Sequence, residues 1–489
     1  MVSQKLEKAN RQQEKGNKEI PMEQRPIFHF SAPIGWLNDP NGFSYYKEEY
    51  HLFYQYHPYD TNWGPMHWGH SKTKDFIKWE QLPVALAPDL EYDKEGCFSG
   101  SALEYDGKHV LMYTGVTTKE TENGKSAALQ TQCIAVGDGI SYHKIEKNPV
   151  ITGELLPTGC SREDFRDPKI WQEKDAFYAV AGNRDQNGSG QILLFTSKDL
   201  NCWNYCGILL KNNYEYGSMW ECPDFFELDG NHVLLVSPQD MEAKDLEFHC
   251  GNGTLSVIGK FDKTNLIFHR ENQRAIDYGL DFYAPQTVRT KDDRRIMIAW
   301  MQSWDYHMGN EEFKWSGMMT VPRELRVENG TLFQVPVREI ETYYGDTVTY
   351  EHVTIDGMLE LEGIHGRTLD MTIEVNAGEY KTFEIILAAN EQHYTTLSYE
   401  RDQSVVTFNR TYSGDKRDRT HIRSMRVKEA QGKIKLRVLL DWYSVEVFLN
   451  DGEKAMTSLI YTEREAQKIQ FCTEGKAEFC ITKHEINRE

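Results

Sequence analysis

Three short segments of this sequence place a carboxylate directly before a proline or one residue further upstream. They are Trp36-Leu-Asn-Asp-Pro-Asn-Gly42, Phe165-Arg-Asp-Pro-Lys169 and Trp220-Glu-Cys-Pro-Asp224. Proline fixes its own φ and biases the preceding residue towards extended backbone, so each segment is expected to hold a side chain in a preset direction. A rigid scaffold presents acids to a pocket in this way, although Asp-Pro and Asn-Gly taken alone are ordinary turn formers. Recurrence in three segments favours the functional interpretation.

The elements that must position these acids form a fivefold repeat. Runs rich in aromatic and β-branched residues follow polar turns and begin near His51, His109, Ala176, His232 and Arg295. Their spacings are 58, 67, 56 and 63 residues. Most runs are followed by a second shared feature, seen in 71–79 and 197–203 and more weakly in 137–142, and then by an apolar strand. Each unit therefore holds about four strands.

Four-stranded units repeated radially around a channel are typical of a β-propeller, and five units predict five blades. The alternative is a long meander or sandwich with accidental periodicity. In a propeller the innermost strand of each blade comes first, and its start faces the central funnel. The polar residues just before each aromatic run are therefore candidates for a site, and they include Phe98-Ser-Gly-Ser101 and Asp281-Phe-Tyr-Ala-Pro-Gln286.

Near Tyr350 the residue pattern changes to a regular alternation of apolar and polar residues, as in 382–387, 433–440 and 445–449. This pattern predicts half-buried antiparallel strands and a β-sandwich. Helix signals are confined to the first twenty residues and a turn or two near 336–340. We therefore expect an all-β fold with a polar N-terminal extension (1–24), a five-bladed β-propeller (25–340) and a C-terminal β-sandwich (350–489).

Composition excludes several classes of partner. The chain has 55 Lys and Arg against 75 Asp and Glu, and its net charge of −20 would repel phosphate backbones and anionic membranes. We therefore expect no nucleic-acid or membrane partner. The N-terminus lacks the apolar core of a secretion signal, and the nine scattered cysteines are interpreted as reduced thiols, so the predicted location is cytoplasmic. No ligand cluster argues for a metal, and we expect no cofactor.

The five segments together resemble the invertase family of glycoside hydrolases, which includes β-fructosidases, inulinases and sucrose-6-phosphate hydrolases. The resemblance runs from about Arg25 to the C-terminus. It also includes Gln55-Tyr-His-Pro58, Asn62-Trp-Gly64, Trp315-Ser-Gly317, Val321-Pro-Arg-Glu-Leu325 and Ser444-Val-Glu-Val-Phe-Leu-Asn450. An ordered set of this kind across the chain is highly specific. The family is five-bladed with a C-terminal sandwich, in agreement with the repeat count.

The resemblance implies a role for each acid. Asp39 would be the nucleophile, Glu221 the acid/base, and Asp167 the residue that stabilises the transition state. A fructofuranosyl bond breaks through an oxocarbenium-like state, which needs a carboxylate on one face and a proton donor on the other. Glu221 must then start protonated, while Asp167, beside Arg166, would stay ionised and accept hydrogen bonds from fructose hydroxyls.

The same matching gives eight candidates for substrate contact, although packing between blades could explain the aromatic ones. They are Asn38, Gln55, Trp63, Phe98, Ser99, Arg166, Tyr283 and Trp300. Cys222, next to the acid, is interpreted as a packing residue rather than a nucleophile.

The resemblance leaves several alternatives open. A fructosyltransferase would use the same intermediate, and a non-catalytic propeller could bind fructans or sucrose. Sucrose, sucrose 6-phosphate and short fructo-oligosaccharides are all candidate substrates. Phosphate recognition would need cations at the leaving-group rim, for which Lys125, Arg184 and Lys314 are candidates. The sandwich could mediate a homodimer, and the first 24 residues are expected to be disordered or a helical arm.

Overall fold

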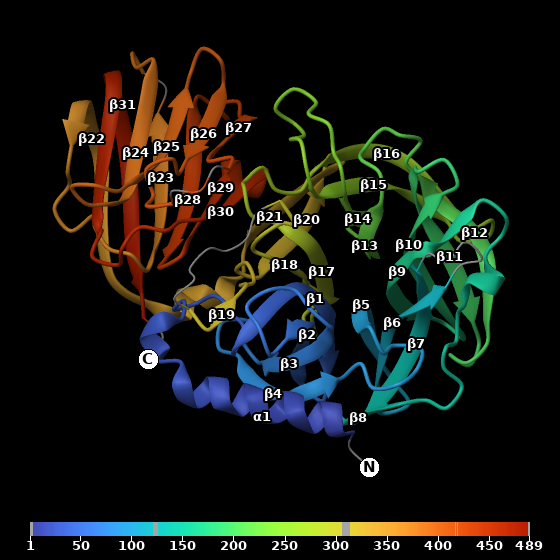
Figure 1. Cartoon of the computed structure of the whole chain (residues 1–489). Helices are drawn as coiled ribbons and strands as arrows, with labels where there is room; N and C mark the ends of the chain where they lie inside the picture. The colour runs from blue at the N-terminus through green and yellow to red at the C-terminus, as the bar shows by residue number, and fades with distance from the viewer. Residues whose placement is uncertain are drawn as a thin grey trace.

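The computed structural model describes residues 3–120, 126–305, 313–376, 378–415, 417 and 419–487. Five sheets of four or five strands form a ring around a central channel, and a separate β-domain lies beside the ring (Figure 1). The predicted all-β fold, with a five-bladed propeller followed by a second β-domain, is confirmed.

Each blade is an antiparallel sheet whose first strand lies innermost. The first and second blades contain β1 (Gly35–Tyr46), β2 (Glu49–His57), β3 (His67–Thr73), β4 (Glu80–Leu86), and β5 (Gly96–Tyr105), β6 (Lys108–Glu120), β7 (Ser126–Gly137), β8 (Tyr142–Lys144). The third and fourth contain β9 (Cys160–Glu173), β10 (Ala176–Asp185), β11 (Gly190–Ser197), β12 (Trp203–Lys211), and β13 (Trp220–Leu228), β14 (Asn231–Pro238), β15 (Leu255–Asp262), β16 (Ile267–Ala275). The fifth contains β17 (Tyr283–Arg289), β18 (Arg295–Trp300), β20 (Arg323–Glu328) and β21 (Thr331–Pro336).

The aromatic runs lie on the second strand of each blade, not on the first. They correspond to β2, β6, β10, β14 and β18, while the polar segments before them form the innermost strands themselves. The physical reason is burial. A second strand is covered by the neighbouring blades on both faces, as in β2 and β18, and so reads as an apolar run, whereas an innermost strand also lines the channel and keeps polar side chains.

The second shared feature of the repeat is a turn between the third and fourth strands of a blade. In three blades an aspartate closes this turn by accepting two backbone N–H groups through Oδ1. Asp75 accepts from Ile77 and Lys78, Asp138 from Ile140 and Ser141, and Asp199 from Asn201 and Cys202. The repeat seen in the sequence therefore has one structural cause, an aspartate-capped turn.

The second domain is one curled sheet of ten strands. They are β22 (Tyr344–Leu359), β23 (Leu369–Asn376), β24 (Thr382–Ala389), β25 (Thr395–Glu400), β26 (Val405–Asn409), β27 (Ile422–Arg426), β28 (Lys433–Asp441), β29 (Ser444–Leu449), β30 (Lys454–Leu459) and β31 (Lys468–Ile486). The long β31 pairs with β24 through its first half and with β23 through its second half. The two halves of the sheet share one apolar core, so the predicted sandwich is present as two layers of a single folded sheet.

Two carboxylates of the second domain join the start of the propeller to its end. Asp441 accepts the backbone N–H groups of Ile27 and Phe28 and contacts His29 Nδ1 at 2.8 Å. Glu446 contacts His29 Nε2 at 2.8 Å and also bonds the N–H of Val321 and the guanidinium of Arg323 in the last blade. A short strand, β19 (Trp315–Ser316), adds a second link by pairing with the start of β1.

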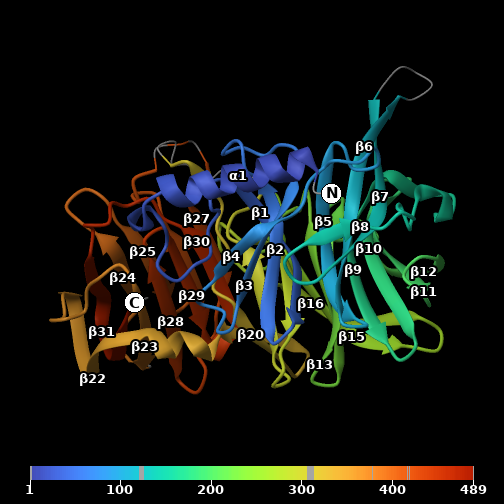
Figure 2. The same cartoon turned by 90° about the horizontal axis from the view of Figure 1, so that it is seen from below.

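The first helix, α1 (Gln4–Glu19), lies along the outer edge of the first blade (Figures 1 and 2). Asn10 Oδ1 accepts the N–H of Val84 at 2.8 Å, and Gln13 Nε2 donates to the carbonyl of Leu82 at 2.8 Å. These amides occupy the hydrogen-bonding groups of edge strand β4 that a neighbouring strand would otherwise use. Disorder and a helical arm were both open for the first 24 residues, and the structure shows the helix. The helical turn expected near 336–340 is a 3₁₀-helix at Arg338–Tyr343.

The other helical segments are short. Two further 3₁₀ turns follow α1 and β8, at Met22–Gln24 and Gly153–Leu155, and another precedes β30, at Asn450–Gly452. Within the described residues, no helix combines the length and apolar character that crossing a membrane would require.

Candidate active site

A β-bulge interrupts each of the five innermost strands, near the start of the strand in four blades and between Arg166 and Lys169 in β9. In the last three blades the bulge gives a positive φ to the residue before a proline, at Asp167 (64°), Cys222 (48°) and Ala284 (51°). The expectation of extended backbone is therefore wrong for the residues before Pro168 and Pro223, while Asp39, before Pro40, has no positive φ. The bulge turns each N–H sideways, towards a side chain of the preceding blade.

Hydrogen bonds from these bulges link the blades in sequence around the channel. Asp167 N donates to Thr114 Oγ1 at 2.9 Å, Cys222 N to Asp167 Oδ2 at 3.0 Å, and Ala284 N to Ser237 Oγ at 3.0 Å. Gly100 N donates to Asn41 Oδ1 at 2.9 Å, which joins the second blade to the first. Asp167, one of the three predicted acids, thus takes part in the hydrogen bonds that connect neighbouring blades.

Asp39 lies on β1 with its carboxyl group buried. Its Oδ2 accepts a hydrogen bond from Ser99 Oγ at 2.7 Å and contacts Cys222 Sγ at 3.4 Å. Its Oδ1 is also buried and has no hydrogen-bond partner among the described residues. One oxygen is therefore held in place while the other keeps its lone pairs available, as attack on an electrophilic carbon requires.

Asp167 lies on β9 beside Asp39. Cys222 links the two, because its Sγ is 3.6 Å from Asp167 Oδ2 as well as close to Asp39, and its N–H bonds the same Asp167 oxygen. Burial raises the pKa of Asp39, and the charge of Glu221 raises it further against the bond from Ser99. Burial also raises the pKa of Asp167 to about 7, although Arg166 opposes this shift. Asp167 thus holds a proton more readily than the sequence suggested.

Glu221 lies at the start of β13 and is bound by three side chains. Arg166 contacts Oε1 at 3.0 Å, and Gln239 Nε2 and the Tyr283 hydroxyl each donate to Oε2 at 2.8 Å. Burial and the charge of Glu221 hold the pKa of Tyr283 well above its usual value, so the phenol remains a donor. Together these contacts fix the direction of the carboxyl group at the mouth of the channel.

Five of the eight predicted substrate residues fall into two groups. Ser99 and Arg166 bond the acids directly, and so does Tyr283. Asn38 and Gln55 are buried beside them, with Asn38 Oδ1 accepting from Trp36 Nε1 and Gln55 Nε2 donating to the Cys97 carbonyl.

The remaining predicted residues are aromatic. Trp63, on the loop after β2, is 48% exposed and meets the ring of Phe98 edge-on with 6.0 Å between centroids. Trp300 is fully buried between Trp36 and Trp304, so its position is one of packing. Substrate contact by these residues stays a prediction.

Sequence reasoning missed several residues on or just after the second strands of the blades. Gln239 bonds Glu221, Thr114 holds the Asp167 backbone, and Asn183 Nδ2 donates to the Asp164 carbonyl at 2.7 Å. Asp164 in turn bonds Arg166 and Arg184. A signal was present in the repeat, because an amide or hydroxyl side chain recurs where each aromatic run ends, as Gln55 also does.

The arrangement provides the components for a two-step displacement. A buried carboxylate with an unbonded oxygen lies near a second acid whose orientation is fixed by donors, and the charges of both raise the pKa of a third acid beside them. Such a set can form and then hydrolyse a covalent ester with a substrate carbon, with one acid giving and later taking a proton.

Comparisons with known proteins cover both domains. The model of the Glycosyl hydrolases family 32 N-terminal domain matches residues 29–336, and the model of the Glycosyl hydrolases family 32 C terminal matches residues 339–487. Sucrose-6-phosphate hydrolase of Escherichia coli is 36% identical over 446 residues, which are 91% of each chain. Raffinose invertase of Escherichia coli is 35% identical over the same length and the same shares.

Solved structures agree with this result. The β-fructofuranosidase of Bombyx mori aligns with a TM-score of 0.84 at 33% identity and covers 99% of both chains. A variant of that enzyme in complex with sucrose aligns equally well. The sucrose-6-phosphate hydrolase of Lactobacillus gasseri also gives a TM-score of 0.84, at 26% identity, covering 100% of this chain and 97% of its own.

Proposed function

Because this chain belongs to family 32 of the glycosyl hydrolases and is an enzyme of the β-fructofuranosidase type, we propose that it hydrolyses sucrose-like β-D-fructofuranosides through a covalent fructosyl-enzyme. The observation that carries the proposal is the free, buried Oδ1 of Asp39 beside Glu221.

In the proposed first step, Asp39 Oδ1 attacks the anomeric carbon of the fructosyl unit while Glu221 gives its proton to the departing oxygen. Asp167 accepts hydrogen bonds from fructose hydroxyls as positive charge develops on the ring. In the second step, water attacks the ester, and Glu221, now ionised, takes the water's proton. Asp39 is released and Glu221 is protonated again.

A specific arrangement supports sucrose 6-phosphate as a substrate. Arg184 is the last residue but one of β10, the second strand of the third blade. It is 39% exposed and pairs with Asp164 at 2.5 Å, and Asp164 also bonds Arg166. A guanidinium at this rim could bind a phosphate on the leaving sugar. Lys314, the second candidate, is 62% exposed and pairs with Glu19 of α1 at 3.0 Å. The third, Lys125, lies outside the described residues.

The test is the initial rate of glucose or glucose 6-phosphate release from sucrose, sucrose 6-phosphate and 1-kestose. Asp39→Ala and Glu221→Gln should each lower the rate by roughly 10³-fold or more, because each removes a group used in the transition state. Equal release by wild type and both variants would reject the proposal. Free fructose equal to free glucose indicates hydrolysis, and a deficit of fructose indicates transfer to another sugar.

The Arg184→Ala variant tests whether Arg184 binds the phosphate of sucrose 6-phosphate. Loss of a charge-assisted contact to phosphate should raise KM for sucrose 6-phosphate by roughly 10-fold or more and leave KM for sucrose nearly unchanged. Sucrose serves as the control on the same variant. If both substrates are affected equally, Arg184 acts through Asp164 and Arg166, and its proposed role in phosphate binding is wrong.

A further inference from the structure

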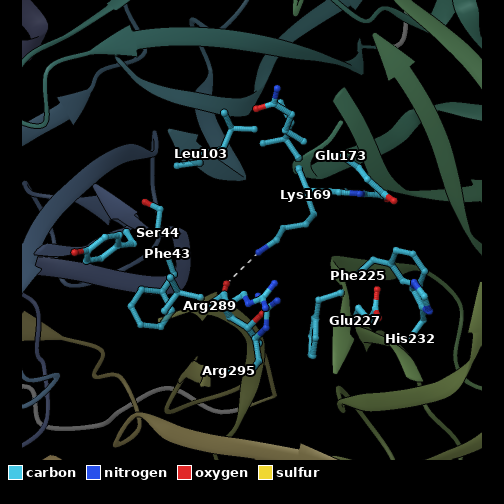
Figure 3. Close-up of a pocket in the computed structure, with 18 of the residues that line it drawn as sticks. Phe43, Ser44, Leu103, Lys169, Glu173, Phe225, Glu227, His232, Arg289 and Arg295 are labelled. Carbon is cyan, nitrogen blue, oxygen red and sulfur yellow. Dashed lines mark hydrogen bonds between the residues drawn. The ribbon is translucent and has the colours of Figure 1, made fainter. Parts of the chain in front are cut away.

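A cavity of about 540 Å³ occupies the end of the central channel opposite the acids. The innermost strands of all five blades line it, through Phe43 and Ser44, Leu103, Lys169, Phe225 and Arg289 (Figure 3). Tyr283, which bonds Glu221, and Arg289 stand at opposite ends of β17, about 20 Å apart at the usual rise of a strand. We call this space the far-mouth cavity.

The side chain that marks the far-mouth cavity is Arg295, at the start of β18. Its guanidinium lies over the ring of Phe226 at 4.6 Å, and its buried Nε has no hydrogen-bond partner. No ion pair to it is formed within the part of the chain that the structure describes. Burial lowers the pKa of Arg295 to about 10, so it remains charged at neutral pH. The carboxylates of Asp224 and Asp293 oppose this shift from a distance without pairing with Arg295, and a half-buried charge without an ion pair is costly unless an anion reaches it.

The other cations around the cavity all have partners. Lys169 Nζ bonds Asp224 at 3.0 Å and the carbonyl of Thr287 at 3.2 Å, and Lys263 pairs with Glu173 at 2.7 Å. Arg289 pairs with Asp293 on the exposed side of the same strand end. Figure 3 shows Arg295 beside Arg289, with Lys169 reaching towards them across the cavity. An anion bound at Arg295 would therefore also meet the positive ends of two paired side chains.

The other side chains that line the cavity indicate what kind of molecule carries the anionic group. Phe43 and Phe225 supply apolar faces, and the carboxylates of Glu173 and Glu227 can accept hydrogen bonds from hydroxyl groups. The volume is in the range of sites for small organic ligands rather than for a bare ion. The ligand that fits this lining is a compact molecule with several hydroxyl groups and one strongly anionic group.

We propose that the far-mouth cavity is a second ligand site, which binds a sugar phosphate with its phosphate on Arg295, separately from the catalytic centre. Arginine's planar fork matches two phosphate oxygens at once, and hydroxyl groups of the sugar would face Glu173 and Glu227. The site performs no chemistry, and catalysis at Asp39 does not depend on its occupancy.

The test is binding by calorimetry at constant ionic strength, with glucose 6-phosphate, inorganic phosphate and glucose as separate probes. Wild type should bind glucose 6-phosphate, bind phosphate more weakly, and not bind glucose. Arg295→Gln should weaken glucose 6-phosphate binding by tenfold or more. Arg295→Lys should weaken it by less, because a lysine keeps the positive charge but cannot bind two phosphate oxygens at once as a guanidinium does. Hydrolysis rates of Arg295→Gln should equal those of wild type.

Arg326→Gln is the matched control, since Arg326 also lies over a phenylalanine ring, that of Phe333, but outside the cavity. Its binding should equal that of wild type. The proposal is overturned if wild type binds no probe, or if Arg295→Gln and Arg295→Lys both bind as wild type does. Binding by Asp39→Ala that saturating sucrose abolishes would also overturn it, because the probe would then occupy the catalytic centre. If inorganic phosphate binds as tightly as glucose 6-phosphate does, the proposed contacts of the sugar with Glu173 and Glu227 are wrong.

Discussion

At the scale of single residues, the acids are tuned by burial. Asp39 must be ionised to attack, yet burial raises its pKa above the ordinary value of 3.8 and brings that of Asp167 to about 7. Protons therefore remain on this pair to a higher pH than on exposed aspartates. We expect kcat/KM to fall as pH decreases below about 7, and a profile flat down to pH 4 would contradict this.

Ser99→Ala sharpens that prediction. The Ser99 hydroxyl donates to Asp39 Oδ2 and so favours the ionised form. Its removal should move the acid limb of kcat/KM to higher pH, whereas Ser99→Thr, which keeps a hydroxyl, should leave it near the wild-type position. The measurement is the pH profile of all three proteins, and identical limbs would show that the bond is not made in solution.

Cys222 is the residue that touches both aspartates. Burial raises the pKa of its thiol well above the usual value, so it is a neutral donor rather than a nucleophile. Cys222→Ala removes this donor and keeps the backbone bond to Asp167, and kcat should fall by roughly 2- to 10-fold. Cys222→Ser should recover most of the loss. An unchanged kcat in the alanine variant would show that the thiol contributes only to packing, which is the role that the sequence suggested.

The sequence predicted which acids would meet because each is anchored in a repeated segment. It could not identify Gln239 or Thr114 as partners, because their contacts depend on how two strands align across a bulge. The backbone of Asp167 shows the same limit. A proline after it predicts extended geometry from local sterics, but the hydrogen bond to Thr114 is a contact with another blade and decides the conformation.

At the scale of elements, α1 protects the edge of the first blade with two amide side chains. Asn10→Ala combined with Gln13→Ala should leave the N–H of Val84 and the carbonyl of Leu82 without these partners. We expect a loss of about 1–3 kcal/mol in unfolding free energy, seen as a lower Tm. Gln4→Ala is the control, because this exposed amide lies on another face of the same helix. Equal Tm values for the control and the double variant would contradict the role of α1.

The fold was predictable at this scale where periodicity is strong. The five aromatic runs and the alternating strands 433–440 and 445–449 correspond to strands in the structure. The innermost strand comes first in each blade, as predicted, but the sequence did not assign the aromatic runs to the second strand. Burial on both faces and the lining of a channel leave different patterns, and a single sequence does not show which pattern belongs to the inner strand. The curl of the second sheet at β31 depends on long-range pairing and has no local signal.

At the scale of the whole molecule, a buried charged network holds the two domains together, with His29 at its centre. Burial opposes a charge on His29, but its bonds to Asp441 and Glu446 outweigh this and raise its pKa to about 9. A raised value means that the stabilisation is complete below pH 6.5 and is lost as pH rises towards 9. The expected loss is about 3 kcal/mol.

His29→Gln should therefore lower Tm at pH 6 and remove most of the decline in Tm between pH 6.5 and 9. His352→Gln is the control, because His352 also pairs with a glutamate, Glu478, but is 70% exposed. Thermal unfolding of the three proteins across this pH range provides the measurement. A wild-type decline that persists unchanged in His29→Gln would assign the alkaline loss to other groups.

The junction made by Asp441 and Glu446 also constrains when the enzyme can be completed during its synthesis. A ribosome that has released the first 340 residues has produced every blade, yet neither carboxylate that joins the first blade to the last. The nascent ring must wait for about a hundred further residues before it can be sealed at this point. Chains released early by a stop codon before Asp441 would thus carry all three active-site acids on a ring whose ends are joined through β19 but lack both carboxylate links, and they should be more sensitive to proteolysis than the full chain.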